Sequence, residues 1–207
     1  MIKLKLFSID VYISFWIFVF LAYTTVSSVS GQRVLLICLF CTVVHEAGHI
    51  IMICKFRGRP ERIVLKPFEF KIYADLSELT VSQDVLITCF GVVANLILGL
   101  FAYMFYLLFC YEVLLIICLA SLAIGFINIL PVESFDGGQL LRIFLVHFLS
   151  EKLSSIVSFV VSVLFVIPIA YFGIGVLFVS KYNFSLLFIA IYILSIYFKR
   201  NCGDSID

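Results

Sequence analysis

The feature that most constrains this chain is a series of apolar segments, each long enough to cross a bilayer, with short polar stretches between them. A membrane-spanning helix needs about 20 mostly apolar residues. Of the 207 residues, 64% are hydrophobic and 13% are charged, and the mean hydropathy is +1.21. An ordinary soluble domain is roughly 45–50% apolar and about a quarter charged. We therefore expect an integral membrane protein that forms one domain, residues 1–207, with very little soluble mass.

The predicted fold class is an all-α polytopic membrane protein with about six transmembrane helices. The expected spans cover residues 11–29, 34–54, 84–110, 113–130, 154–179 and 183–198. The first apolar segment lacks a small-residue cleavage pattern, which favours a retained span over a signal peptide. Between the second and third spans, the stretch from Arg62 to Tyr73 alternates locally and predicts a short β-hairpin that turns near Pro67. Its edge offers a place for strand addition by an extended peptide, and a surface loop without a binding role is the alternative.

The distribution of positive charge predicts the orientation. All of the 14 Lys and Arg residues except Arg33 and Lys181 fall on one side of a six-span arrangement. Positive charge is enriched in cytoplasmic loops, so both termini are expected in the cytoplasm, in a multi-pass protein of the cell membrane. A net charge of +1 gives no sign of a nucleic-acid partner. The odd number of cysteines, mostly inside apolar segments, argues against a disulfide framework.

The second predicted span carries the chemistry. His45 and His49 stand four residues apart, and a helix would place them about one turn apart on one face, with Glu46 beside them. Two imidazoles at this spacing can share a zinc ion, with a neighbouring glutamate placed to act on a water molecule. Ionisable groups at the centre of a span cost about 2.5–3.5 kcal/mol each and are functional by default. Cys41, one turn before His45, is either a packing residue or a soft ligand.

A catalytic zinc usually has three protein ligands, and the sequence offers a third after the fourth span. Pro131 stops that helix, and Gly137 and Gly138 then let the backbone turn sharply beside Asp136. The charge distribution places this turn on the side of the two histidines, where a reentrant segment can deliver Asp136. Glu133 is the rival ligand, and a plain interhelical loop is the other alternative.

Together, these stretches resemble the two signatures of the site-2 protease family of intramembrane zinc metalloproteases. The first signature is His45-Glu46-Ala47-Gly48-His49, and the second runs from Asn128 through Pro131 to Asp136-Gly137-Gly138. The small six-span layout is most like the stage IV sporulation protease branch. The resemblance implies one zinc ion per chain, held by His45, His49 and Asp136. It also implies that Glu46 is the general base and that Asn128 lies near the active site, beside the substrate or the developing oxyanion.

The third predicted span adds a glycine-to-asparagine motif. The resemblance assigns Gly91, Asn95 and Pro131 to substrate binding. On the residues alone, Gly91, Asn95 and Gly99 form a small helix face suited to close approach of another helix. Packing without any contact to substrate is therefore the alternative for this face.

The resemblance implies a zinc metalloendopeptidase that cleaves a membrane-associated or single-span protein, in regulated proteolysis of a signalling or transcription factor. The expected surroundings are the lipid bilayer of a bacterial cell, with a regulatory membrane protein as a further partner. The chain departs from the family pattern at Gln139, where a basic residue is frequent, and it has no segment long enough for a PDZ-type domain. A catalytically silent relative that binds membrane proteins and a metal transporter are the two alternative functions.

Overall fold

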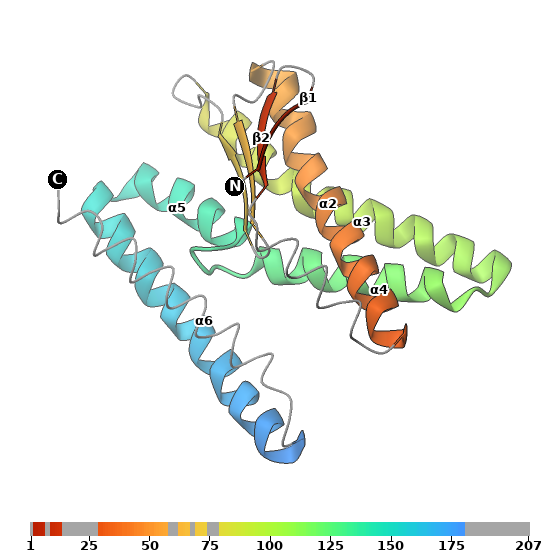
Figure 1. The fold of residues 1–207 in the computed structure, drawn as a ribbon. Coiled ribbons are helices and arrows are strands. Elements are labelled where there is room, and N and C mark those ends of the chain that lie inside the picture. Colours follow the sequence, from red (N-terminus) through yellow and green to blue (C-terminus); the bar gives the residue numbers. More distant parts are fainter. Residues whose placement is uncertain are drawn as a thin grey trace. The chain divides into compact units, whose positions relative to one another are not determined.

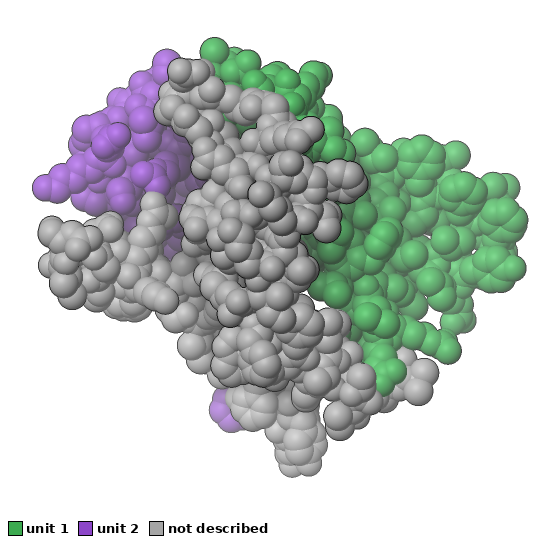
Figure 2. All heavy atoms as spheres, turned by 45° about the horizontal axis from the view of Figure 1, so that its top comes forward, with its two compact units in different colours: residues 1–127 green, residues 128–207 purple. Residues whose placement is uncertain are grey.

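The structure is a computed structural model that describes residues 2–6, 9–13, 29–57, 62–66, 69–73 and 79–180. Contacts divide the chain into two compact units, Met1–Ile127 and Asn128–Asp207, which are coloured separately in Figure 2. That residues 1–207 form one domain stays a prediction.

A four-stranded sheet and three long helices make up the first unit (Figure 1). The strands are β1 (Ile2–Leu6), β2 (Ile9–Ile13), β3 (Arg62–Lys66) and β4 (Glu69–Tyr73), and they lie in that order in the sheet. β1 pairs antiparallel with β2, and β3 pairs antiparallel with β4. β2 and β3 run parallel, with Asp10 opposite Arg62. Parallel neighbours require a crossover connection, and here the crossover contains the histidine-bearing helix.

The three helices of this unit are α2 (Val29–Arg57), α3 (Val81–Phe109) and α4 (Glu112–Ile129). α2 and α3 pack along each other, and Met52, Ile53 and Ile87 form a buried apolar cluster where they meet. Thr80 and Gln83 cap the start of α3 with reciprocal hydrogen bonds. α3 ends at Cys110, whose left-handed backbone (φ 54°) turns the chain toward α4.

The second unit contains α5 (Asp136–Phe148) and α6 (Glu151–Ser180), which contact each other. Its apolar core joins Val132, in the turn before α5, to Val166 of α6. α5 occupies most of the stretch between the fourth and fifth predicted spans. Three serines of α6, Ser154, Ser158 and Ser162, are also buried.

Four helices in the described part of the chain are long and apolar enough to cross a membrane: Gly31–Phe56, Val81–Phe109, Glu112–Ile129 and Glu151–Tyr171. Large apolar side chains are exposed along them, among them Leu108 at 72% and Phe126 at 70%, as expected for surfaces that face lipid. The protein is therefore a membrane protein, and the four helices correspond to the second to fifth predicted spans.

Of the six predicted spans, four correspond to helices in the described residues. The sixth, residues 183–198, lies outside them, as does most of the first. The predicted start of the first span is wrong, because Val11, Tyr12 and Ile13 belong to strand β2 and pair with β3. The pairing of β1 with β2 was also not predicted. In the stretch where a hairpin was expected, β3 and β4 are the observed strands, and the turn at Pro67 lies outside the described residues.

Candidate metal centre

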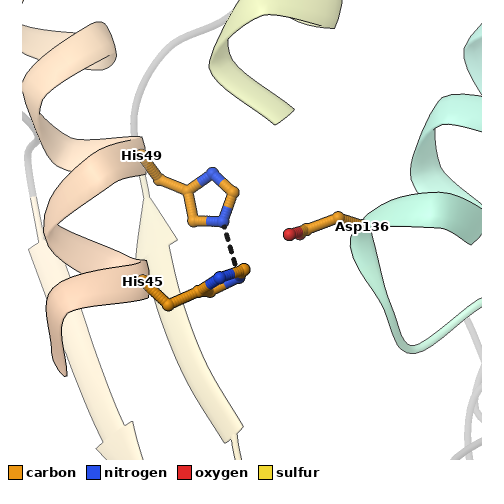
Figure 3. Close-up of side chains that lie close together, drawn as sticks. All are labelled: His45, His49 and Asp136. Carbon is orange, nitrogen blue, oxygen red and sulfur yellow. Dashed lines mark hydrogen bonds between the residues drawn. The ribbon is translucent and has the colours of Figure 1, made fainter. Parts of the chain in front are cut away.

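His45 and His49 face each other from successive turns of α2, and both are buried, at 3% and 9% exposure (Figure 3). Their Nε2 atoms are 3.2 Å apart, with the ring planes at 82° to each other. Two nitrogen ligands at about 2.0–2.1 Å from a tetrahedral zinc are about 3.3–3.4 Å apart. The spacing of the imidazoles therefore fits two positions of a tetrahedral zinc site.

A backbone contact fixes the orientation of the second imidazole. Nδ1 of His49 lies 2.8 Å from the carbonyl oxygen of Ile87, on α3. A carbonyl oxygen only accepts hydrogen bonds, so this nitrogen carries the proton and donates it. The Nε2 atom of His49 is then the unprotonated nitrogen of the ring, which is the form that binds a metal.

Two glycines allow α2 and α3 to approach closely at the histidines. A Cβ atom on Gly48 would lie 2.5 Å from the carbonyl oxygen of Phe90 and 2.9 Å from Cβ of Ala94. A Cβ atom on Gly91 would lie 2.6 Å from Cε1 of His49 and 2.8 Å from Cε1 of His45. No side chain larger than hydrogen fits at either position, so each glycine is required by the packing around the imidazoles.

Asn95 lies one turn after Gly91 on α3 and is fully buried. Its Nδ2 atom is 3.4 Å from Nδ1 of His45. Gly125 of α4 lies close to this residue, since a Cβ there would lie 3.6 Å from Cβ of Asn95. The structure thus brings Gly91 and Asn95, which were predicted for substrate binding, into contact with the two histidines.

Cys41, one turn before His45, is also fully buried. The hydroxyl of Ser121 donates to its sulfur over 3.2 Å, and the thiol lies 3.9 Å from the carbonyl oxygen of Ile117. Ser121 and Ile117 both belong to α4. These contacts make Cys41 part of the junction between α2 and α4.

In the second unit, Asp136 is the first residue of α5, and Figure 3 labels it together with the two histidines. The turn before it is tight: Val132 donates to the carbonyl of Leu130 over 2.7 Å, and Phe135 donates to that of Val132 over 2.8 Å. A negative side chain in the first turn of a helix is favoured by the helix dipole. The turn predicted from Pro131 and the two glycines is therefore present, and it leads directly into Asp136.

The same turn packs against its own backbone. A Cβ on Gly137 would lie 2.6 Å from the carbonyl oxygen of Leu130 and would also overlap the carbonyl of Ile129. A Cβ on Gly138 would overlap the carbonyl of Val132 and lie 2.7 Å from Cα of Glu133. Sequence reasoning assigned these glycines to sharp turning, and the structure shows that they are needed for close packing.

A contact with α6, which the sequence did not predict, holds this turn. The backbone N–H of Glu133 donates to the hydroxyl of Ser162 over 2.9 Å, and that hydroxyl donates to the carbonyl of Ser158 over 2.8 Å. Ser162 is buried. The regular spacing of Ser154, Ser158 and Ser162 by four residues was the available signal in the sequence.

The remaining predicted site residues also lie in the described part of the chain. Glu46 follows His45 on α2 and is half-buried. Asn128 is half-buried near the end of α4, and Pro131 follows that helix. The structure does not test the catalytic roles of Glu46 and Asn128 or the substrate contact of Pro131, and these stay predictions.

One family model and a solved structure match this chain. Residues 109–168 match the family model described as Peptidase family M50. A solved structure titled "Site-2 Protease from Methanocaldococcus jannaschii" has a TM-score of 0.71 and 20% sequence identity, covering 93% of this chain and 91% of that chain. No curated protein matches the chain. The matched residues include Asn128, Pro131 and Asp136, and the likeness to the solved structure is one of fold.

The donor atoms of the predicted ligands suit zinc. His45 and His49 each offer one imidazole nitrogen, and Asp136 of the second unit offers one carboxylate oxygen. Two nitrogens and one oxygen are a common ligand set for a catalytic zinc ion, which keeps its fourth position open.

Proposed function

We propose that this protein is an intramembrane zinc metalloprotease that cleaves a membrane-embedded or single-span protein substrate. The observation that carries the proposal is the buried pair of imidazoles, whose Nε2 atoms are 3.2 Å apart inside a candidate membrane span. The donation from His49 to Ile87 adds to it, because it presents Nε2 as a ligand. We further propose Asp136 as the third ligand of the same zinc ion.

The proposed chemistry assigns a role to each residue. Zinc, when bound, acts as a Lewis acid that activates a water molecule and polarises the scissile carbonyl. Glu46, beside the ligands on α2, accepts the proton of the attacking water and later passes it to the leaving amine. Asn128 donates a hydrogen bond to the developing oxyanion. A substrate helix has to unwind locally before its carbonyl is accessible, because helical carbonyls already accept hydrogen bonds.

We place Pro131 and the turn after it beside the unwound substrate, as the motif resemblance implies. The proposed setting is a multi-pass protein of a bacterial cell membrane, with both termini in the cytoplasm, acting in regulated intramembrane proteolysis. A regulatory membrane protein is a further proposed partner. Membership of the stage IV sporulation protease branch stays a prediction from the motifs.

The decisive experiment compares the membranes of cells that express the wild type, Glu46→Gln or Glu112→Gln. Both variants remove one carboxylate, but Glu112 is exposed at the start of α4. If the protein is a protease, one or more single-span precursors are expected to accumulate with Glu46→Gln only, while the purified variant keeps one zinc ion per chain. Identical membrane proteomes for Glu46→Gln and the wild type would contradict the proposal.

The third ligand is tested by zinc content. Asp136→Asn is expected to lower the bound zinc and abolish cleavage, whereas Glu133→Gln is expected to keep both. Full zinc occupancy in Asp136→Asn together with loss of zinc in Glu133→Gln would instead assign the ligand to Glu133.

A further inference from the structure

The amide of Asn95 stands at one end of a chain of hydrogen bonds that runs through both histidines. Nδ2 of Asn95 faces Nδ1 of His45, Nε2 of His45 faces Nε2 of His49, and Nδ1 of His49 faces the Ile87 carbonyl. With both rings neutral and Nδ2 facing His45, one set of proton positions satisfies all three contacts. Asn95 donates to Nδ1 of His45, His45 donates from Nε2 to His49, and His49 donates to Ile87.

This arrangement differs from the one that a metal requires. A ligating Nε2 atom has no proton, so His45 has to carry its proton on Nδ1 when it binds zinc. The NH2 group of Asn95 would then face an N–H group, which is a contact between two donors. A half-turn of the amide about its last side-chain bond would present Oδ1 to the same nitrogen as an acceptor.

A second observation at Asn95 supports this reading. Its Oδ1 atom is buried and has no hydrogen-bond partner among the described residues. Turning the amide therefore breaks no hydrogen bond made by Oδ1. In the turned orientation, Oδ1 accepts a hydrogen bond from Nδ1–H of His45, and the imidazole stays neutral.

We propose that Asn95 is a positioning residue that can serve either tautomer of His45: Nδ2 donates to an unprotonated Nδ1, and Oδ1 accepts from a protonated Nδ1, the form in which Nε2 can bind zinc. This role rests on the proposed function, and it replaces substrate contact as the reason for an asparagine in the third-span motif. An amide suits this role because its NH2 group donates and its oxygen accepts, and the two groups have nearly the same shape.

The test measures zinc affinity in purified protein by competition with a chelator. Asn95→Leu, which has neither donor nor acceptor, is expected to bind zinc about 10–100-fold more weakly, the range typical for loss of a partner to a metal-bound histidine. Asn95→Asp, an acceptor of similar size, is expected to restore the affinity to at least that of the wild type. Ser121→Ala is the matched control, because Ser121 is equally buried and contacts Cys41.

A spectroscopic readout separates positioning from general packing. The visible absorption of the Co²⁺-substituted protein reports the ligand field, and it is expected to change in Asn95→Leu and to return in Asn95→Asp. If Asn95→Leu does not fold, Asn95→Ala takes its place in the same comparison. Wild-type zinc affinity and an unchanged Co²⁺ spectrum in the apolar variant, with only the KM for substrate raised, would overturn the inference.

The inference and the proposed function fail in different ways. A wild-type protein that binds no zinc overturns the proposed function. A wild-type protein that binds zinc and cleaves substrate, together with apolar Asn95 variants of unchanged zinc affinity, overturns only the role of Asn95.

Discussion

Gly91 of α3 lies so close to the imidazole of His49 on α2 that a Cβ atom would be 2.6 Å from Cε1 of that ring. The same Cβ would be 2.8 Å from Cε1 of His45. Carbon atoms in contact lie about 3.5–4.0 Å apart, so a single methyl group at this position displaces both candidate ligands.

Gly91→Ala is therefore expected to reduce zinc occupancy and abolish cleavage, because both rings have to shift. The measurement is the zinc content of the purified variant. Gly99→Ala is the matched control on the same helix, since its Cβ would lie 3.4 Å from the flexible side chain of Leu122. Full zinc occupancy in Gly91→Ala would show that the rings lie elsewhere in the metal-bound protein.

Gly137→Ala is expected to prevent the native form of the turn before Asp136, because the added methyl group overlaps the Ile129 carbonyl and comes within 2.6 Å of the Leu130 oxygen. Backbone atoms cannot move aside as a flexible side chain can. Cleavage is expected to fall to the level of Asp136→Asn. Gly175→Ala, where nothing lies within 4 Å of the new methyl group, is expected to retain full activity, and equal loss in both variants would contradict this account.

Ser162→Ala is expected to lower the free energy of unfolding by about 1–3 kcal/mol, because the backbone N–H of Glu133 loses its acceptor. Ser154→Ala is the matched comparison on the same helix. The Ser154 hydroxyl is buried without a hydrogen-bond partner among the described residues, so its removal is expected to leave the stability unchanged or to raise it. Unfolding in detergent measures both variants, and equal losses would rule out a specific role for the Ser162 contact.

Cys41→Ala is expected to keep one zinc ion per chain and to cost about 1 kcal/mol of stability, since Ser121 loses the sulfur to which it donates. A double-mutant cycle with Ser121→Ala measures the coupling between the two residues. Loss of zinc from Cys41→Ala would instead make the thiol a ligand.

The sequence predicted best the parts of the fold that depend on composition alone. The third span was expected over residues 84–110 and α3 covers Val81–Phe109, because a long apolar run defines a membrane helix with little help from its neighbours. The strands β1 and β2 were missed, although Ile2-Lys3-Leu4-Lys5-Leu6 alternates apolar and charged residues. The parallel pairing of β2 with β3 joins segments far apart in the sequence, and no local pattern encodes it.

For the site, helical spacing predicted that His45 and His49 share one face, and their Nε2 atoms are indeed neighbours. The contact between His45 and Asn95 depends on how α2 and α3 are set against each other along their lengths. A single sequence contains no measure of that offset. The partners of the imidazoles were therefore beyond sequence reasoning, whereas the imidazoles themselves were not.

Gly48 gives the five-residue stretch from His45 to His49 a second role, in the packing of two helices. The histidines present nitrogen atoms on one side of the helix, while Gly48 rests against the backbone of Phe90 on its neighbour. The motif thus supplies two nitrogen atoms that can bind a metal and, within the same turn, sets how closely α3 packs against α2. In a saturation scan for activity, Gly48 is accordingly expected to tolerate as few residue types as either histidine, although it has no side chain with which to perform chemistry.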